Sequence, residues 1–305
     1  MFKNFSPQSL GINGRQSELI ELALTYAFRG MDVDMGDMLR RSQRTTVDDA
    51  TKYVRAAEIK IGGFDLDVNL DADDDTFTNQ VATLHPLAEL AASLEAVCAT
   101  IRVPAATDRL PYHEYFETQQ ARLGQIAGVL GGQGIRLAVG FRAGKELEEG
   151  KQFPFVRNVE GLLALVRGVG NGVGVLIDTW DWVVGDGGMD QIRDLSAQEI
   201  VSVRLGSVPG DVDAPSAITK ERVLPEMNGP IDHVGLVKHL ETLGFEGPVS
   251  PTASSLRYKG QTRESIVQQA QEAVDGIFRE AGLTVAPRPM DLIEEYAMQE
   301  MMPEE

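Results

Sequence analysis

The stretch Val173-Gly174-Val175-Leu176-Ile177, followed at once by Asp178-Thr179-Trp180-Asp181-Trp182, decides the fold of this 305-residue chain. The first five residues form the most β-like run in the sequence, with three β-branched side chains and one leucine. A carboxylate that directly follows such a strand lies at the carboxyl end of its sheet. In an α/β barrel, that edge is the mouth at which ligands bind.

Outward from this segment, short β-like runs alternate with amphipathic helices. We predict strands at residues 10–12, 31–33, 58–61, 101–103, 135–139, 173–177, 200–203 and 248–250. We predict helical segments at 16–28, 34–57, 77–98, 112–130, 159–166, 189–195, 231–243 and 264–281. Eight strand-then-helix units favour parallel strands closed into one barrel over an open, doubly wound sheet.

The predicted fold class is therefore α/β, a single (β/α)8 TIM barrel over residues 1–285. Residues 286–305 are rich in Asp and Glu, and after Arg288 they contain no Lys or Arg. We interpret them as an acidic C-terminal tail. Its apolar residues leave a docking helix open as the alternative to a frayed end.

Composition excludes several classes of protein. The chain has 28 Lys and Arg against 46 Asp and Glu, a net charge of −18, and no clustered basic residues, so we expect no nucleic-acid partner. It has no apolar run of membrane-spanning length and no signal-like N-terminus, so we expect no membrane association and a cytoplasmic location. Cys98 is the one cysteine, which excludes an internal disulfide. Homo-oligomerisation is left open.

Two segments resemble ligand sites but fail on spacing. The glycine-rich residues 168–174 precede a strand, whereas a phosphate-binding loop follows one, so we predict a helix-to-strand turn. The acidic residues 65–75 place Leu70 where a calcium-binding EF-hand loop needs Gly and are followed by Thr76 where it needs Glu. We predict a solvated loop there, with a helix N-cap near Asp74 or Asp75.

The histidines do not point to a metal centre. His85, His233 and His239 lie in predicted helices, and His113 lies in the approach to one. No histidine ends a predicted strand, so we expect each to pack on a helix or face solvent. Two charged residues lie at strand ends instead: Asp178 follows the sixth predicted strand and Arg204 follows the seventh. The carboxylate could bind or do acid–base work, or cap the following loop, and the guanidinium needs a partner where it is buried.

Five segments in register carry a resemblance across nearly the whole chain. They are Leu10-Gly11-Ile12 with Gly30-Met31-Asp32, Phe153-Pro154-Phe155-Val156, Asp178-Thr179-Trp180, Arg222-Val223-Leu224-Pro225 with Gly229-Pro230-Ile231-Asp232, and Gly244-Phe245-Glu246-Gly247-Pro248-Val249-Ser250. Together they resemble the sugar phosphate isomerase/epimerase family, the xylose isomerase-like TIM barrels. Residues 226–228 depart from the family pattern.

The resemblance implies a divalent cation, such as Mn, Mg, Co or Zn, held at the mouth by Glu, Asp, His and Glu. In this sequence those four positions fall on Gly140, Asp178, Arg204 and Thr252. A further family histidine, near metal and substrate, is Asp181 here. Three of the four ligands are therefore replaced, and we predict no metal and no cofactor.

Electrostatics favours the same interpretation. The family's ligands carry three negative charges, whereas the four residues here sum to zero. A guanidinium about 4 Å from a divalent ion repels it by roughly 8 kcal/mol at an effective dielectric constant near 20. We therefore predict that Arg204 pairs with Asp178 and takes the place of the metal.

Two functions remain open. In the first, the chain is a pseudoenzyme that binds a small anionic or polyhydroxy ligand, sugar-like or sugar-acid-like, through Arg142, Lys145 and Arg204, with Trp180 as a stacking wall. In the second, it is an active sugar or sugar phosphate isomerase or epimerase. Its centre would be rebuilt around Asp178, Asp181 and a loop carboxylate such as Glu226, or would use Asp181 as a metal-free base. A nuclease would need a multi-histidine metal cluster, which the sequence does not offer.

Overall fold

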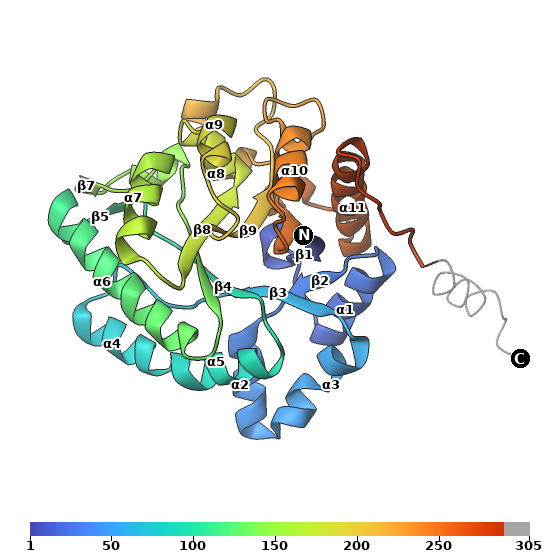
Figure 1. Cartoon of the computed structure of the whole chain (residues 1–305), viewed down its shortest axis with the longest axis horizontal. Helices are drawn as coiled ribbons and strands as arrows, with labels where there is room; N and C mark the ends of the chain where they lie inside the picture. The colour runs from blue at the N-terminus through green and yellow to red at the C-terminus, as the bar shows by residue number, and fades with distance from the viewer. Residues whose placement is uncertain (290–305) are drawn as a thin grey trace, which may run out of the picture.

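The computed structural model describes residues 1–289, and these form a closed barrel of eight parallel strands surrounded by helices (Figure 1). Around the barrel the order is β1, β10, β9, β8, β6, β4, β3, β2. The strands are β1 (Phe2–Phe5), β2 (Gly30–Asp32), β3 (Lys60–Asp65), β4 (Cys98–Arg102), β6 (Arg136–Gly140), β8 (Val173–Asp178), β9 (Ile200–Leu205) and β10 (Pro248–Pro251). The predicted single TIM barrel is confirmed.

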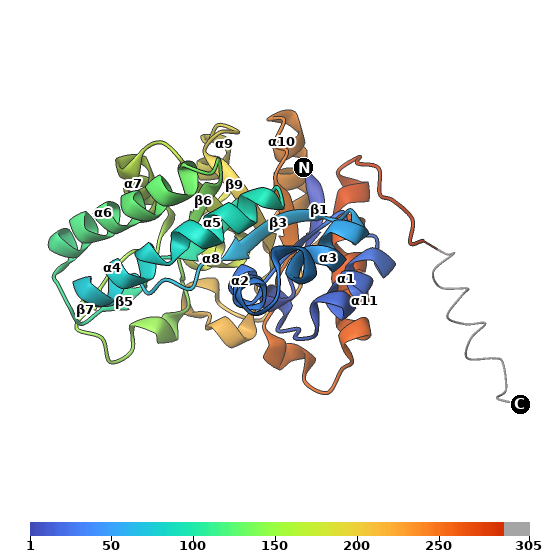
Figure 2. The same ribbon diagram turned by 90° about the horizontal axis from the view of Figure 1, so that it is seen from below.

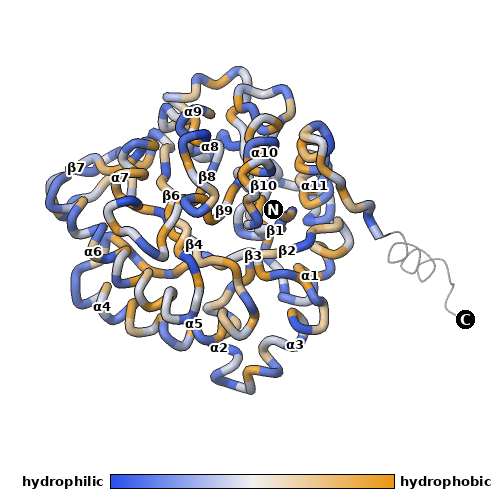
Figure 3. Tube along the Cα trace, viewed as in Figure 1, coloured by the Kyte–Doolittle hydropathy of each residue, from blue (hydrophilic) through white to orange (hydrophobic). Residues whose placement is uncertain are grey.

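Helices cover the barrel on all sides, and the view from below shows α4 to α7 flanking the strands opposite α1, α3 and α11 (Figure 2). They are α1 (Gln16–Thr25), α2 (Met35–Arg44), α3 (Val47–Ala57), α4 (Asp74–Ala82), α5 (Leu84–Ser93), α6 (Tyr112–Gly131), α7 (Val159–Val169), α8 (Thr179–Val184), α9 (Met189–Arg193), α10 (His233–Thr242) and α11 (Arg263–Glu280). Apolar and polar segments alternate along the outer helices, as in helices with one buried face (Figure 3).

Side chains along each strand point alternately outward, to the core between strands and helices, and inward, to the interior of the barrel. Val175 and Ile177 of β8 pack in the main apolar core, so Leu176 and Asp178 face inward. The same alternation turns Arg204 of β9 inward, between the core residues Val203 and Leu205. Polar side chains at the carboxyl ends of the strands are thereby brought to one mouth.

The first predicted strand is wrong. Residues 8–10 form a short 3-10 helix, and the first strand is β1, only four residues long and buried along its whole length. This strand was not predicted because Lys3 lies in the middle of it, and a charged residue is not expected in a buried strand. In the structure the Lys3 side chain is buried outside the barrel in an ion pair with Asp275 of α11, with Nζ 2.7 Å from Oδ1. A buried lysine is rare without such a partner, and the sequence does not show the partner.

Other boundaries shift without changing the topology. The third strand is β3 rather than 58–61, and helix 77–98 is in fact α4 and α5, with Cys98 already in β4. Short strands β5 (Ala106–Thr107) and β7 (Phe153–Pro154) pair antiparallel outside the barrel. The N-cap of α4 is Asp73, whose side chain accepts a hydrogen bond from the Thr76 amide, rather than Asp74 or Asp75. The turn from α7 to β8 at residues 170–172 is confirmed.

Four short 3-10 helices besides η1 (Gln8–Leu10) lie in the loops: η2 (Lys145–Glu148), η3 (Ala214–Ser216), η4 (Thr219–Glu221) and η5 (Ser255–Tyr258). Arg288 stacks on Tyr26 of α1, with 4.3 Å between its guanidinium carbon and the ring centroid. The rest of the predicted acidic tail, residues 290–305, lies outside the described residues. Within residues 1–289, no helix is both long and apolar enough to cross a bilayer.

The Lys3–Asp275 pair joins the first strand to the last helix, and we expect Asp275→Ala to lower the free energy of unfolding by about 3 kcal/mol, because it leaves a buried ammonium without its partner. The double variant Lys3→Met, Asp275→Leu removes both charges and should cost less than the single variant. Urea unfolding of both proteins measures this. A double variant as unstable as Asp275→Ala would contradict the ion-pair explanation.

Candidate functional site

Polar side chains from several strands and loops meet at the mouth of the barrel. Asp178 at the end of β8 lies opposite Arg204 of β9, and Arg102 at the end of β4 lies opposite Gly140 of β6. Arg102 and Arg204 border a cavity of about 520 Å³. Its walls are Gln8, Ser9, Asp65, Arg102, Arg142, Glu146, Leu147, Asp181, Arg204, Thr219, Arg222, Thr252, Ala253 and Ser254.

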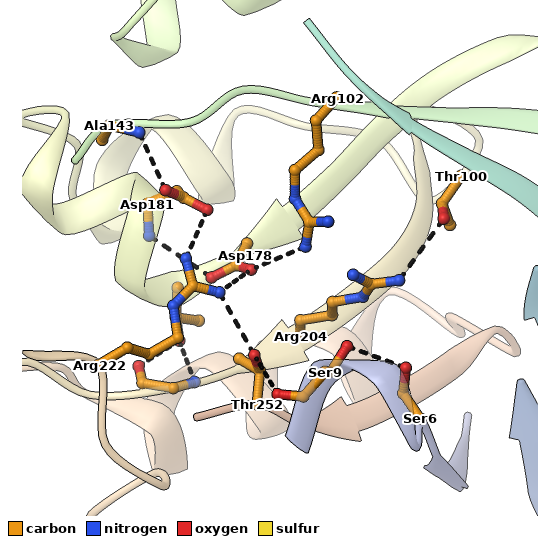
Figure 4. A network of polar contacts seen from close by, with 12 residues as sticks. Ser6, Ser9, Thr100, Arg102, Ala143, Asp178, Asp181, Arg204, Arg222 and Thr252 are labelled. Carbon is orange, nitrogen blue, oxygen red and sulfur yellow. Dashed lines mark hydrogen bonds and ion pairs between the residues drawn. The ribbon is translucent and has the colours of Figure 1, made fainter. Parts of the chain in front are cut away.

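Arg222 bridges two buried carboxylates. Its Nη1 lies 2.7 Å from Asp178 Oδ2 and its Nη2 lies 2.8 Å from Asp181 Oδ2. Its guanidinium carbon lies 4.7 Å from the ring centroid of Trp180, a cation–π contact. The loop between β9 and α10, which carries Arg222, is thereby fixed across the mouth (Figure 4).

The local fold explains why two carboxylates face one guanidinium. Asp178 is the N-cap of α8, and its Oδ1 accepts a hydrogen bond from the Asp181 amide at 3.4 Å. Residues three apart lie on the same face of a helix, so Asp178 and Asp181 point the same way. The amide of Ala143 donates to Asp181 Oδ1 at 2.9 Å and fixes that carboxylate from the other side.

Arg102 and Arg204 reach the cavity from different strands. In Figure 4 the Arg102 guanidinium points toward Asp178, whereas that of Arg204 points away from it, toward Thr100. Arg102 Nη2 lies 3.3 Å from Asp178 Oδ2. Arg204 Nη2 lies 2.9 Å from Asp65 Oδ1 and 3.9 Å from Asp32 Oδ2. Within residues 1–289, the Nε and Nη1 groups of these two arginines have no hydrogen-bond partner. These unpaired donors thus remain available to a ligand.

The pKa values describe an uneven balance of charge. Burial, and then Arg204, lower the pKa of Arg102 to about 10. Burial acts to raise the pKa of Asp65, but Arg204 and Arg102 outweigh it and lower that pKa to about 2. The negative charge of Asp65 is therefore well compensated, whereas Arg102 has too little negative charge nearby.

Two carboxyl groups keep their protons more easily than usual. Burial raises the pKa of Asp181, against the opposing effect of Arg222, and the neighbouring Asp178 raises it further. Burial also raises the pKa of Asp32, although Arg204 and the side-chain amide of Asn4 oppose the shift. The pKa of Asp178 is lowered, because Arg222 and Arg102 together outweigh its burial.

The structure brings most of the predicted site residues together. Asp181, Arg204 and Thr252 line the cavity beside Asp178, and the exposed Arg142 lies at its rim. The predicted ion pair between Arg204 and Asp178 is wrong, because Arg204 pairs with Asp65, while Asp178 binds Arg222 and Arg102. Residues directly opposite each other on neighbouring strands need not form an ion pair when other arginines reach the same carboxylate.

Three predicted roles do not match the structure. Trp180 is fully buried and supports Arg222 from behind, so it does not form a wall of the cavity. Lys145 is exposed and lies outside the cavity walls. Glu226 is also exposed and outside them, so it does not join Asp178 and Asp181. A helix of six residues turns Trp180 away from the mouth while keeping Asp178 and Asp181 on it.

The histidine prediction is confirmed for the strand ends, since all four histidines lie in helices. The sequence analysis missed the roles of Arg102, Arg222, Asp32 and Asp65. Arg102 and Asp32 each end a strand, so the rule applied to Asp178 would have found them. Asp65 was missed because the third strand was placed too early. Arg222 comes from a loop, where no strand rule applies.

The residues at the mouth do not fit the metal that the fold family implies. Gly140 and Thr252 supply no carboxylate, and Arg204 is a cation. The surviving Asp178 has Arg222 and Arg102 on its Oδ2 and the Asp181 amide on its Oδ1. Across residues 1–289, no three histidine, cysteine, aspartate or glutamate side chains are placed to hold a metal ion. Hard divalent cations need several oxygen ligands free to coordinate.

Residues 20–280 match the family described as "Xylose isomerase-like TIM barrel". The chain belongs to this family. No curated protein sequence matches the chain significantly.

Solved structures of other family members share the fold. A xylose isomerase domain protein from Alicyclobacillus acidocaldarius is 22% identical, with a TM-score of 0.81, and the match covers 92% of this chain and 99% of that one. IolI protein, whose structure holds a zinc atom, is 16% identical, with a TM-score of 0.77 and the same coverage. D-psicose 3-epimerase from Clostridium cellulolyticum, solved with D-tagatose, is 15% identical, with a TM-score of 0.69, again over 92% and 99% of the two chains. At these identities the likeness establishes the fold alone.

Arg222 is the main partner of both Asp178 and Asp181, so Arg222→Met should lower the free energy of unfolding by about 3–5 kcal/mol at pH 8. Without Arg222 the folded-state pKa of Asp181 rises further above its unfolded value, and the pKa of Asp178, which loses the main cation that lowers it, rises as well. Protonation then favours the folded state, so the loss should shrink as the pH falls from 8 to 5.5. Arg142→Met removes an exposed cation and should change stability by less than about 0.5 kcal/mol. Urea unfolding at both pH values measures this. A loss that is equal at the two pH values would contradict the explanation.

Proposed function

We propose that this chain binds a small anionic, polyhydroxy ligand of the sugar-acid type at the barrel mouth, without metal-dependent catalysis. The observation that carries the proposal is a pair of arginines that line the cavity, the half-buried Arg102 and the buried Arg204, whose Nε and Nη1 donors are unpaired within residues 1–289. Unpaired guanidinium donors in a partly buried site are best satisfied by a carboxylate or phosphate.

The charge of the cavity supports an anionic ligand. Its walls hold four arginines against three carboxylates, in a protein whose net charge is −18. A local excess of positive charge in a concave site focuses the field and attracts small anions. Burial, and then the neighbouring Arg204, lower the pKa of Arg102, and a bound anion would oppose both effects.

The remaining wall residues supply hydrogen bonds suited to hydroxyl groups. Gln8, Ser9, Thr219 and Thr252 line the cavity with hydroxyl or amide side chains. Thr252 Oγ1 already accepts from Arg222 and donates to the Ser9 carbonyl, at 3.3 Å and 3.2 Å, so its position is fixed. A ligand with an acid group and several hydroxyl groups matches this lining better than a bare inorganic anion.

A metal-free isomerase or epimerase remains the second candidate, favoured by the raised pKa of Asp181. A carboxyl group whose pKa is raised toward the working pH is better suited to act as a general acid or base. Both oxygens of Asp181 are engaged, by Arg222 and the Ala143 amide, so proton transfer would require Arg222 to move away. Turnover of a ketose or sugar phosphate that is abolished in Asp181→Asn, yet insensitive to chelators, would establish this function.

Binding should depend on Arg102. We expect D-gluconate to raise the thermal unfolding temperature, whereas D-sorbitol, which lacks the carboxylate, should not. Arg102→Met should weaken gluconate binding by about 10- to 100-fold, the value of a charged hydrogen bond. Because burial of Arg102 disfavours its charge, the same variant should be at least as stable as the wild type without ligand. Calorimetry and urea unfolding measure the two effects.

Lys145→Met provides the matched control, since it removes the same charge from a side chain outside the cavity. It should leave gluconate affinity within about twofold of the wild-type value. An equal loss in both variants would show that net charge alone attracts the anion. Gluconate that fails to bind the wild type, together with other sugar acids that also fail, would overturn the proposal.

The donor set also predicts low metal content. Protein purified without chelator should contain far less than one equivalent of Mn, Co or Zn by elemental analysis, because Arg204 and Arg222 occupy the region with fixed positive charge. EDTA should leave its thermal unfolding temperature unchanged. Near-stoichiometric metal that disappears in Asp178→Asn would contradict the metal-free interpretation.

A further inference from the structure

A second cavity adjoins the arginine-lined one. It encloses about 300 Å³ beneath the loops that follow β1 and β2. The two cavities share Gln8 and Asp65 in their walls, so they lie side by side at the mouth, and we refer to the two together as the cleft. The other residues of the second cavity are Ser6, Pro7, Ile12, Asn13, Gly14, Gln16, Leu19, Met31, Asp32, Val33, Asp34, Asp37 and Arg41.

Charge is segregated along this cleft. The second cavity has four carboxylates and one arginine in its walls, whereas the first has four arginines and three carboxylates. The lone Arg41 is already paired, with its Nε 2.9 Å from Asp37 Oδ2. At the junction Arg204 Nη2 touches Asp65 at 2.9 Å and stands 3.9 Å from Asp32. One end of the cleft is therefore positive and the other negative.

We propose that the ligand spans both cavities and is zwitterionic, a sugar acid whose carboxylate lies against Arg102 and Arg204 and whose far end carries an ammonium group facing Asp32. This inference rests on the proposed function, because it assigns the second charge of the same ligand.

The surroundings of Asp32 support an ammonium group there. Its Oδ1 accepts from Asn4 Nδ2 at 2.8 Å, but its nearest cation, Arg204, is beyond hydrogen-bond distance. Arg204 is only 2% exposed, and its Nη2 already serves Asp65 and Thr100. Burial raises the pKa of Asp32, and Arg204 and the Asn4 amide only partly oppose the shift. A ligand cation would complete the balance.

Three probes on one six-carbon chain separate the two charges. D-gluconate carries the anion alone, 1-amino-1-deoxy-D-sorbitol carries the cation alone, and 6-amino-6-deoxy-D-gluconate carries both. We expect calorimetry at pH 7.5 to show that the aminogluconate binds about tenfold more tightly than gluconate, the value of one additional charged hydrogen bond. The amino-sorbitol should bind more weakly than either.

Asp32→Asn keeps the size of the side chain and removes its charge. In this variant the aminogluconate should lose its tenfold advantage, whereas gluconate should bind as tightly as before or more tightly, because a repelling carboxylate is gone. The opposite signs exclude simple unfolding as the cause. Unchanged gluconate affinity also confirms that Arg204 keeps its place.

The outcomes distinguish this inference from the proposal on which it rests. If gluconate binds and Arg102→Met weakens its binding as predicted, but the amine gives no advantage, the zwitterion is wrong and the sugar-acid site stands. If none of the probes binds the wild type, both are overturned. An amine advantage that survives in Asp32→Asn would place the ammonium group elsewhere and overturn the assignment to this cavity.

Discussion

The mouth of this barrel depends on one constraint, that Arg222 holds the buried carboxylates of Asp178 and Asp181 together. Two acids three residues apart on α8 repel each other, and neither is accessible to bulk water. Their negative charge is tolerated only because a guanidinium bridges them. The bridge in turn fixes the loop after β9. It also means that Arg102 has to share its partner, Asp178 Oδ2, with Arg222.

This arrangement changes the chemistry available at the mouth. A divalent cation is a strong Lewis acid that coordinates oxygen atoms from several directions. Guanidinium groups offer directional donors of lower charge density, which recognise the plane of a carboxylate and do not polarise a carbonyl group as strongly. The same barrel position therefore suits recognition better than metal-assisted proton or hydride transfer. Fold alone would not have shown this, because the family resemblance extends to strands whose functional residues differ.

The sequence predicted the architecture well, because eight strand–helix units are repeated along the chain and each contributes to the pattern. The sequence did not predict β1, because the charge of Lys3 is compensated by Asp275, which lies 272 positions away in the chain. It also identified Asp178 and Arg204 as mouth residues but paired them wrongly. The position of a residue at a strand end gives the location of its Cα atom, whereas a long arginine side chain can reach partners across the barrel. The actual partners, Asp65 and Arg222, fell outside the predicted strands and were therefore not considered.

The charges at the mouth are balanced unevenly, and this unevenness argues for a ligand. A site evolved only for stability would neutralise each buried guanidinium, as Arg222 and Arg204 are neutralised by their carboxylates. Arg102 is different, because its single close partner is shared and its pKa falls to about 10. Asp32 shows the converse imbalance on the other side of Arg204. Incomplete compensation costs stability, and it is typical of sites where a ligand supplies the missing charge.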